Sequence, residues 1–197
     1  MSIDEQVEAK IKKCKAGSIL FSEDFQDLSN PGAIKVALHR IVKRGNLSRI
    51  ARGIYAKPKY SELVGEVLPS TEDIAKAIAK RDRARILPTG TYAMHVLGLS
   101  TQIPLRLAYL TDGSPRNITI GRRTIQFKKT TTKNLALKGE VSKLVVQALK
   151  EIGKGKSSDE EIKRIIDLLK KEDFKVLKHD ITLVPQWIAE IMVKALK

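Results

Sequence analysis

The sequence predicts an α+β protein in which helices and short strands alternate before a helical C-terminal part. Apolar residues recur at helical spacing in segments such as 29–45 and 70–87. Short runs that favour strands lie at 105–113, 116–121 and 123–129. With 197 residues and 42% hydrophobic content, the chain is long enough for one or two domains with real cores.

The chain is strongly basic, with 37 Lys and Arg against 22 Asp and Glu, a formal net charge of +15. Residues 1–60 carry 12 basic and 6 acidic groups, and residues 61–139 carry 13 and 6. Residues 140–197 are nearly balanced, with 12 and 10. This distribution indicates a polyanionic partner, nucleic acid before anionic lipid, and it places the binding surface in the first 139 residues.

Composition excludes several classes of site. A single cysteine, Cys14, allows no internal disulfide and no thiolate metal cage, and the histidines at 39, 95 and 179 lack ligand spacing. The first residues are polar and acidic, unlike a signal peptide, and no apolar run approaches the length of a membrane span. We therefore expect a soluble cytoplasmic protein with no metal and no cofactor.

The first sixty residues predict helix, strand, helical turn, helix and β-hairpin in that order. A helix is expected over 2–17, a strand over 18–21, and one or two helical turns over 22–28 with Ser22 as N-cap. In 29–45, Asn30 can cap, Pro31 suits the first helical position and Gly45 suits the stop. Segments 47–52 and 53–58 read as two strands joined around Arg52 and Gly53.

This order is typical of a winged helix-turn-helix. The helix 29–45 has a basic exposed side and about the length that fits the DNA major groove, while arginines at the hairpin tip can contact the backbone. The candidate DNA-binding residues are Lys35, His39, Arg40, Lys43, Arg44, Arg49, Arg52 and Lys57. Two alternatives stay open: the basic face can simply be solvated, and winged helices also bind proteins. Tyr55 is expected in the core, and His39 either reads a base or lies in solvent.

The segment LHRIVKRGNLSRIARGIYAKP resembles the N-terminal winged helix of AbiEi-type antitoxins of type IV toxin–antitoxin systems. The matching positions are Gly45, Leu47, Arg49, Ile50, Arg52, Gly53, Ile54, Tyr55 and Pro58. PTGTYAMHVLGLSTQIP and YLTDGSPRNITIGRRTIQFKK are similar to the following domain of the same family, in a branch whose second domain has unknown function. The resemblance covers roughly residues 5–155.

The resemblance implies a transcriptional autorepressor that binds inverted repeats at its promoter and is also an antitoxin. It further implies a nucleotidyltransferase-like toxin encoded beside it, with the second domain tied to antitoxicity. Composition and spacing alone imply neither.

The middle segment predicts a second basic surface. Helices are expected over 70–87, capped by Ser70 or Thr71, and over 89–99, ending at Gly98, followed by the three strands and a helix over 140–153. The surface would comprise Arg81, Arg83, Arg85, Arg116, Arg122, Arg123 and Lys128. Basic residues at a helix end are equally explained by the helix dipole.

Catalysis is not expected, because no Ser-His-Asp set, P-loop or zinc motif is present. Asp112, Gln126 and Lys128 have a faint similarity to a restriction-type nuclease site. A magnesium site prefers carboxylate oxygens, however, and Gln126 offers a neutral amide. Asp112-Gly113 is more simply explained as a turn.

We therefore predict three parts: a winged helix-turn-helix at 1–60, an α+β antitoxin-like domain at 70–155, and a C-terminal helical extension at 156–197. The extension is expected to be a helical hairpin packed on the second domain, or a surface for dimerisation or toxin binding. The predicted function is a DNA-binding autorepressor and antitoxin without enzymatic activity, monomeric or dimeric. The alternative is an RNA- or ribosome-associated binding protein, and a metal-dependent nuclease is the least favoured.

Overall fold

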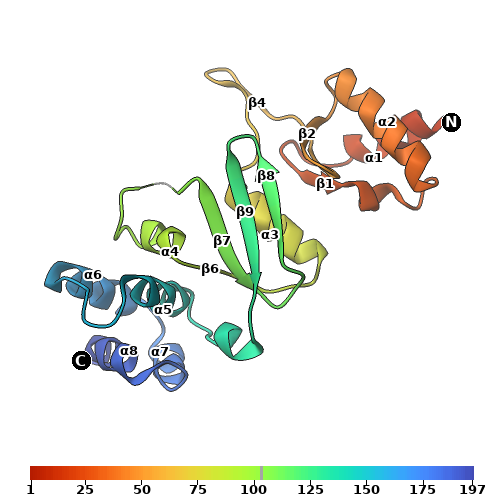
Figure 1. Ribbon diagram of the computed structural model, residues 1–197. Helices are drawn as coiled ribbons and strands as arrows, with labels where there is room; N and C mark the ends of the chain where they lie inside the picture. The colour runs from red at the N-terminus through yellow and green to blue at the C-terminus, as the bar shows by residue number, and fades with distance from the viewer. Residues whose placement is uncertain (103) are drawn as a thin grey trace. The chain divides into compact units, whose positions relative to one another are not determined.

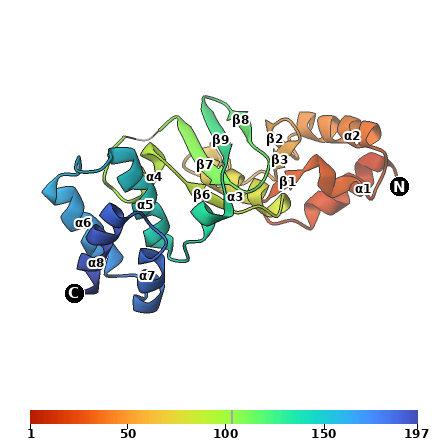
Figure 2. The same cartoon turned by 60° about the horizontal axis from the view of Figure 1, so that its bottom comes forward.

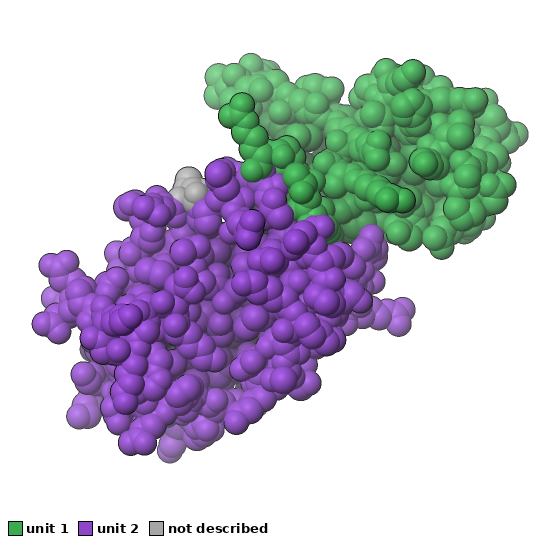
Figure 3. All heavy atoms as spheres, in the orientation of Figure 1, with its two compact units in different colours: residues 1–78, 118–122 green, residues 79–117, 123–197 purple. Residues whose placement is uncertain are grey.

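Residues 1–102 and 104–197 are described by the computed structural model, which has mixed helices and strands and a helical C-terminal part (Figure 1). The predicted α+β class and helical C-terminus are confirmed at this level. The chain divides into two compact units, coloured separately in Figure 3. Unit 1 comprises residues 1–78 and 118–122, and unit 2 comprises 79–117 and 123–197. Among the described residues, no helix is both long and apolar enough to cross a membrane.

Unit 1 begins with the elements expected from its start and stop residues. They are α1 (Ile3–Lys12), β1 (Ile19–Phe21), the 3-10 helix η1 (Ser22–Phe25), α2 (Pro31–Lys43), β2 (Ser48–Ala51) and β3 (Ile54–Ala56). Asn30 caps α2, because its Oδ1 accepts a hydrogen bond from the Ala33 N–H at 3.0 Å. Gly45, at φ +77°, ends it in a conformation that costs other residues strain. The three strands form one antiparallel sheet in the order β1-β3-β2.

The core of unit 1 lies between α1, α2 and this sheet. Helices α1 and α2 lie side by side in both ribbon views (Figures 1 and 2). Apolar side chains at helical spacing on the two helices pack against Leu20, Phe25, Leu47 and Tyr55. The helix residues in this core are Val7, Ile11, Ile34, Ala37, Leu38 and Ile41. This buried set fixes which sides of α2 remain exposed.

Two local expectations for the first 90 residues are wrong, and one further segment contains strands that the sequence did not indicate. Ser22 does not cap η1, because the N-cap is Phe21, whose backbone N–H donates to Asp24 Oδ2 at 2.7 Å. Residues 59–69, for which no element was expected, contain a small hairpin, β4 (Tyr60–Ser61) and β5 (Gly65–Glu66). The helix expected over 70–87 is α3 (Thr71–Arg81), which stops early because the chain turns at Arg83, at φ +52°, into strand β6 (Ile86–Pro88).

The strands expected in the middle of the chain are present. They are β7 (Arg106–Thr111), β8 (Arg116–Ile120) and β9 (Arg123–Lys129), and with β6 they form a sheet in the order β6-β7-β9-β8. Strand β7 runs antiparallel to β6 and parallel to β9. Helix α4 (Thr91–Val96) precedes Gly98, as expected. The buried side chains of the sheet include Tyr109, Ile125 and Phe127.

The C-terminal part contains more helices than the expected hairpin. After the 3-10 helix η2 (Thr132–Leu135) come α5 (Glu140–Ile152), α6 (Asp159–Leu169), α7 (Phe174–Ile181), α8 (Gln186–Val193) and a last 3-10 turn, η3 (Lys194–Leu196). Helix α7 was missed, since it has only eight residues and leaves little room for a helical repeat of apolar positions. Leu177 from α7 joins Val145, Ile165 and Ile188 in one apolar core.

Carboxylates of the tail cap the start of α5. The N-cap of α5 is Gly139, which has no side chain to accept hydrogen bonds from the free N–H groups of the first turn. Asp180, fully buried, accepts from Gly139 N–H at 2.8 Å and from Lys138 N–H at 3.0 Å. Glu172 Oε2 accepts from the backbone N–H of Ser142 at 2.7 Å and from its hydroxyl at 3.0 Å. The tail is thereby tied to α5 by polar contacts as well as apolar packing.

We expect Asp180→Asn to lower the free energy of unfolding by about 1–3 kcal/mol, because one acceptor oxygen is replaced by an NH2 group and at least one of the two backbone donors is left without a full partner. Chemical denaturation, compared at equal m-value, measures the change. Asp167→Asn is the matched control, since Asp167 is exposed on α6. Equal stability of the two variants would contradict a capping role for Asp180.

Candidate nucleic-acid interface

The exposed side of α2 carries two rows of side chains, each with a spacing of four residues. The first row is Lys35, His39 and Lys43, all exposed. In residues 1–102 and 104–197, no ion pair or hydrogen bond engages these three side chains. The row therefore presents basic and hydrogen-bonding groups directly to solvent along the length of the helix.

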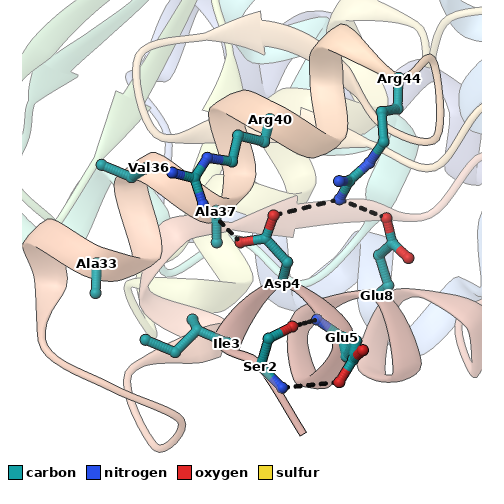
Figure 4. A pocket seen from close by; sticks show the side chains of 10 residues that line it. All are labelled: Ser2, Ile3, Asp4, Glu5, Glu8, Ala33, Val36, Ala37, Arg40 and Arg44. Atoms are coloured by element: carbon teal, nitrogen blue, oxygen red, sulfur yellow. Dashed lines mark hydrogen bonds and ion pairs between the residues drawn. The ribbon is translucent and has the colours of Figure 1, made fainter.

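The second row faces α1 and is neutralised there. It consists of Val36, Arg40 and Arg44, which line an open groove of about 580 Å³ between the two helices (Figure 4). Arg44 Nη2 lies 2.7 Å from Glu8 Oε1 and 3.5 Å from Asp4 Oδ2. Arg40 Nη1 lies 3.7 Å from Asp4 Oδ1. Two of the predicted DNA-binding residues are thus already paired with carboxylates.

The acids of α1 are functional candidates that sequence reasoning missed. Asp4 and Glu8 are four residues apart, the same spacing as Arg40 and Arg44, so two complementary pairs meet across the helix interface. From the sequence alone, the acidic residues at the start of this helix are also explained by the helix dipole, which they complement. The equal spacing of the acids and the arginines could have indicated these ion pairs. That inference, however, requires knowing that α1 packs alongside α2.

The β2–β3 hairpin brings two arginines to the first row. Arg49 and Arg52 are exposed and, with Lys35, line a concave surface of about 380 Å³ that also includes Ser22, Gln26, Pro31 and one acidic residue, Glu23. We call this surface the α2–hairpin groove. Gly53 turns the hairpin at φ +72°, and a Cβ there would lie 3.1 Å from Ser22 Oγ. Glycine therefore serves both the turn and the close approach to η1.

Tyr55 and Lys57 hold the framework behind this groove. Tyr55 is only 6% exposed and belongs to the core, as expected; burial raises the pKa of its hydroxyl, although the charge of Arg49 opposes this. Lys57 Nζ donates to the carbonyl oxygens of Lys12 at 3.0 Å and Cys14 at 2.7 Å. These bonds satisfy carbonyls at the end of α1, so Lys57 is engaged in structure and not presented at the groove.

The second basic surface separates into paired and exposed residues. Arg81 and Arg116 both contact Asp82, and Arg85 Nε lies 2.8 Å from Asp112 Oδ2. Burial tends to raise the pKa of Asp82, but the two arginines outweigh it and the net pKa is lowered. The exposed remainder is Arg83, Arg122, Arg123 and Lys128.

Asp112, the residue behind the nuclease hypothesis, has a structural role. Its Oδ1 accepts from the backbone N–H of Arg85 and its Oδ2 from the guanidinium, both at 2.8 Å. The hydrogen bond to the Arg85 side chain, followed by the one to its backbone, lowers the pKa of this carboxyl. Over the described ranges, no three His, Cys, Asp or Glu side chains gather in a metal-binding arrangement. Asp112 thus connects the start of β6 to the end of β7.

Comparison with known proteins places the chain in a family. No curated protein matches it. One solved structure that aligns with it is the crystal structure of the RV2827C protein from Mycobacterium tuberculosis, at 13% sequence identity and a TM-score of 0.47. That alignment covers 98% of this chain and 80% of the other. Residues 6–177, which include both α2 and the capped start of α5, match the Family of unknown function (DUF6088), and the chain belongs to this family.

Proposed function

We propose that residues 1–60 form a winged helix-turn-helix that binds duplex DNA through the first row of α2 and the β2–β3 hairpin. The observation that supports this most directly is the α2–hairpin groove, where Lys35, Arg49 and Arg52 line one surface. His39 and Lys43 extend that surface along the helix. Cations that are not committed to protein carboxylates are available to displace counterions from phosphates, which is the main source of affinity for DNA.

In this proposal α2 enters the major groove and the hairpin follows the phosphate backbone. Lys35, His39 and Lys43 lie on the side of α2 that would face base edges, where a good bidentate contact discriminates by about 1–3 kcal/mol. Arg49 and Arg52 contact phosphates, and such contacts position the protein without reading sequence. Arg40 and Arg44 are left outside the contact surface, since α1 holds them.

We further propose, from the resemblance to AbiEi-type antitoxins, that the chain is a cytoplasmic autorepressor and the antitoxin of a type IV-like pair. The partner would be a nucleotidyltransferase-like toxin encoded next to it. The N-terminal unit would bind inverted repeats in the shared promoter, and unit 2 would carry the antitoxic activity. No enzymatic step is assigned to the chain.

We expect co-expression of the full chain to restore growth to cells that produce the product of the adjacent reading frame. Growth on inducing plates measures this. The variant Arg52→Ala should lose promoter repression but keep the rescue, because rescue is assigned to unit 2. Growth arrest that persists despite a soluble, expressed chain would refute the antitoxin role and leave DNA binding to be judged separately.

Arg52→Ala should weaken binding to all duplex sequences and flatten the slope of log K against log salt by about one unit, as expected for the loss of one phosphate contact. Fluorescence anisotropy with labelled DNA at several salt concentrations measures both quantities. Arg44→Ala removes the same charge from a carboxylate-paired arginine and should change the slope much less. Tighter binding to RNA of matched length would favour the alternative, an RNA-associated protein.

Asp4→Asn should raise the affinity for duplex DNA by about twofold to fivefold, because it removes a negative charge beside α2 and releases Arg40, while Arg44 keeps its pair with Glu8. The same anisotropy titration measures it. Asp27→Asn is the matched control, since Asp27 is also ion-paired, with Lys10 at 2.7 Å, but no ion pair among the described residues joins it to an arginine of α2. An equal rise in both variants would indicate an effect of net charge alone. It would argue against the idea that Asp4 limits the DNA-binding surface by pairing with the arginines of α2.

A further inference from the structure

The β4–β5 hairpin of unit 1 exposes an apolar tip. Leu63 and Val64 lie in its three-residue loop and are 95% and 72% exposed. Gly65 supports the turn at φ +71°, with open space around it. Adjacent large apolar side chains at a projecting turn lose the stabilisation that burial would give, and exposed apolar patches of this kind commonly mark interaction sites.

The tip is also acidic within a basic protein. Residues 60–69 contain Glu62 and Glu66 and no Lys or Arg, although the chain as a whole carries a net charge of +15. Glu66 accepts a hydrogen bond from the Ser48 hydroxyl, which fixes the base of the hairpin to β2. The tip therefore combines an apolar end with flanking negative charge on an anchored stem.

A pocket with the complementary character lies in the same unit. It has a volume of about 280 Å³ and an apolar floor made by Ile11, Ile41 and Pro58. Lysines 12 and 57 stand at its rim with Glu8, whose carboxylate is paired with Arg44, and the aromatic ring of Tyr60 forms one wall. For comparison, an apolar cavity of about 150 Å³ holds a benzene molecule, so this pocket has room for a branched aliphatic side chain.

The tip cannot fill the pocket of its own chain as it stands, since Leu63 is almost fully exposed while Tyr60, at the start of the same hairpin, already lines the pocket. The tip of a second copy can. Reciprocal insertion uses the same two surfaces on both chains, which is the requirement for a closed two-fold dimer. The acidic flanks would then approach Lys12 at the partner's rim, where two otherwise basic chains attract each other.

We propose that two copies of this chain associate by reciprocal insertion of the β4–β5 tip, with Leu63 as the anchor, into the pocket formed by Ile11, Ile41 and Pro58. This association does not depend on the DNA-binding proposal. It requires only that the two complementary surfaces of unit 1 be accessible at the same time in both copies.

Sedimentation equilibrium of the full chain over a range of concentrations tests the proposal without DNA. We expect a concentration-dependent dimer that Leu63→Asp converts to a monomer, because a charge cannot enter the apolar pocket. Leu63 is exposed, so the variant should fold normally, which circular dichroism checks. Phe174→Asp is the matched control: Phe174 is 58% exposed on α7 in unit 2, and its loss should leave the dimer intact.

A charge exchange gives a second test of direct contact. Glu62→Lys and Lys12→Glu should each weaken the dimer, and combining them in one chain should restore it, since both faces then carry reversed charge. A chain that stays monomeric at all concentrations would overturn the proposal. So would a dimer that Leu63→Asp leaves unchanged, or an apolar tip that instead captures the product of the adjacent reading frame.

Discussion

The spacing of side chains on α2 is the constraint on which the N-terminal unit depends. One side of the helix is buried through Ile34, Leu38 and Ile41, and this burial fixes the rotation of the helix in the unit. The rotation of the helix then determines which way each of its exposed side chains points. The row that starts at Lys35 points to solvent and to the hairpin, and the row that starts at Val36 points to α1. The apolar core thus decides which cations are free and which are paired.

Pairing, more than net charge, localises a polyanion surface in this chain. The excess of basic residues extends over the first 139 positions, and from the sequence every exposed arginine looks equally available. In the fold, Arg44, Arg85 and Arg116 contact carboxylates, and these pairs connect elements within a unit. Exposed ion pairs contribute little stability on average, but they lower the local positive potential that would attract phosphate. The cations at the α2–hairpin groove, which form no ion pair within the described part of the chain, therefore carry the DNA-binding proposal.

Elements with local signals could be predicted from the sequence, and those set by distant contacts could not. Asn30, Pro31 and Gly45 define α2 by short-range hydrogen bonding and backbone geometry, so its bounds followed from the residues themselves. The capping of α5 by Asp180 and Glu172 joins positions 30 to 42 residues apart, and no local pattern marks it. The engagement of Lys57 with the end of α1 spans a similar distance. The exposed first row was visible from periodicity, whereas the neutralisation of the second row required the packing of α1.

The α2–hairpin groove and the apolar pocket of unit 1 lie at opposite ends of α2. The α2–hairpin groove includes Pro31 and Lys35 from the start of the helix, while the apolar pocket includes Ile41, Gly45 and Asn46 from its end. A tip seated in the pocket therefore would not contact Pro31 or Lys35 of the groove, although Lys43, the last residue of the first row, is at the pocket's end of the helix. A two-fold pair would present two such grooves related by the same axis, and an inverted repeat in DNA has that symmetry. Dimerisation through one end of α2 would then favour an operator with the same two-fold symmetry, because each copy would present its groove to one half of the repeat.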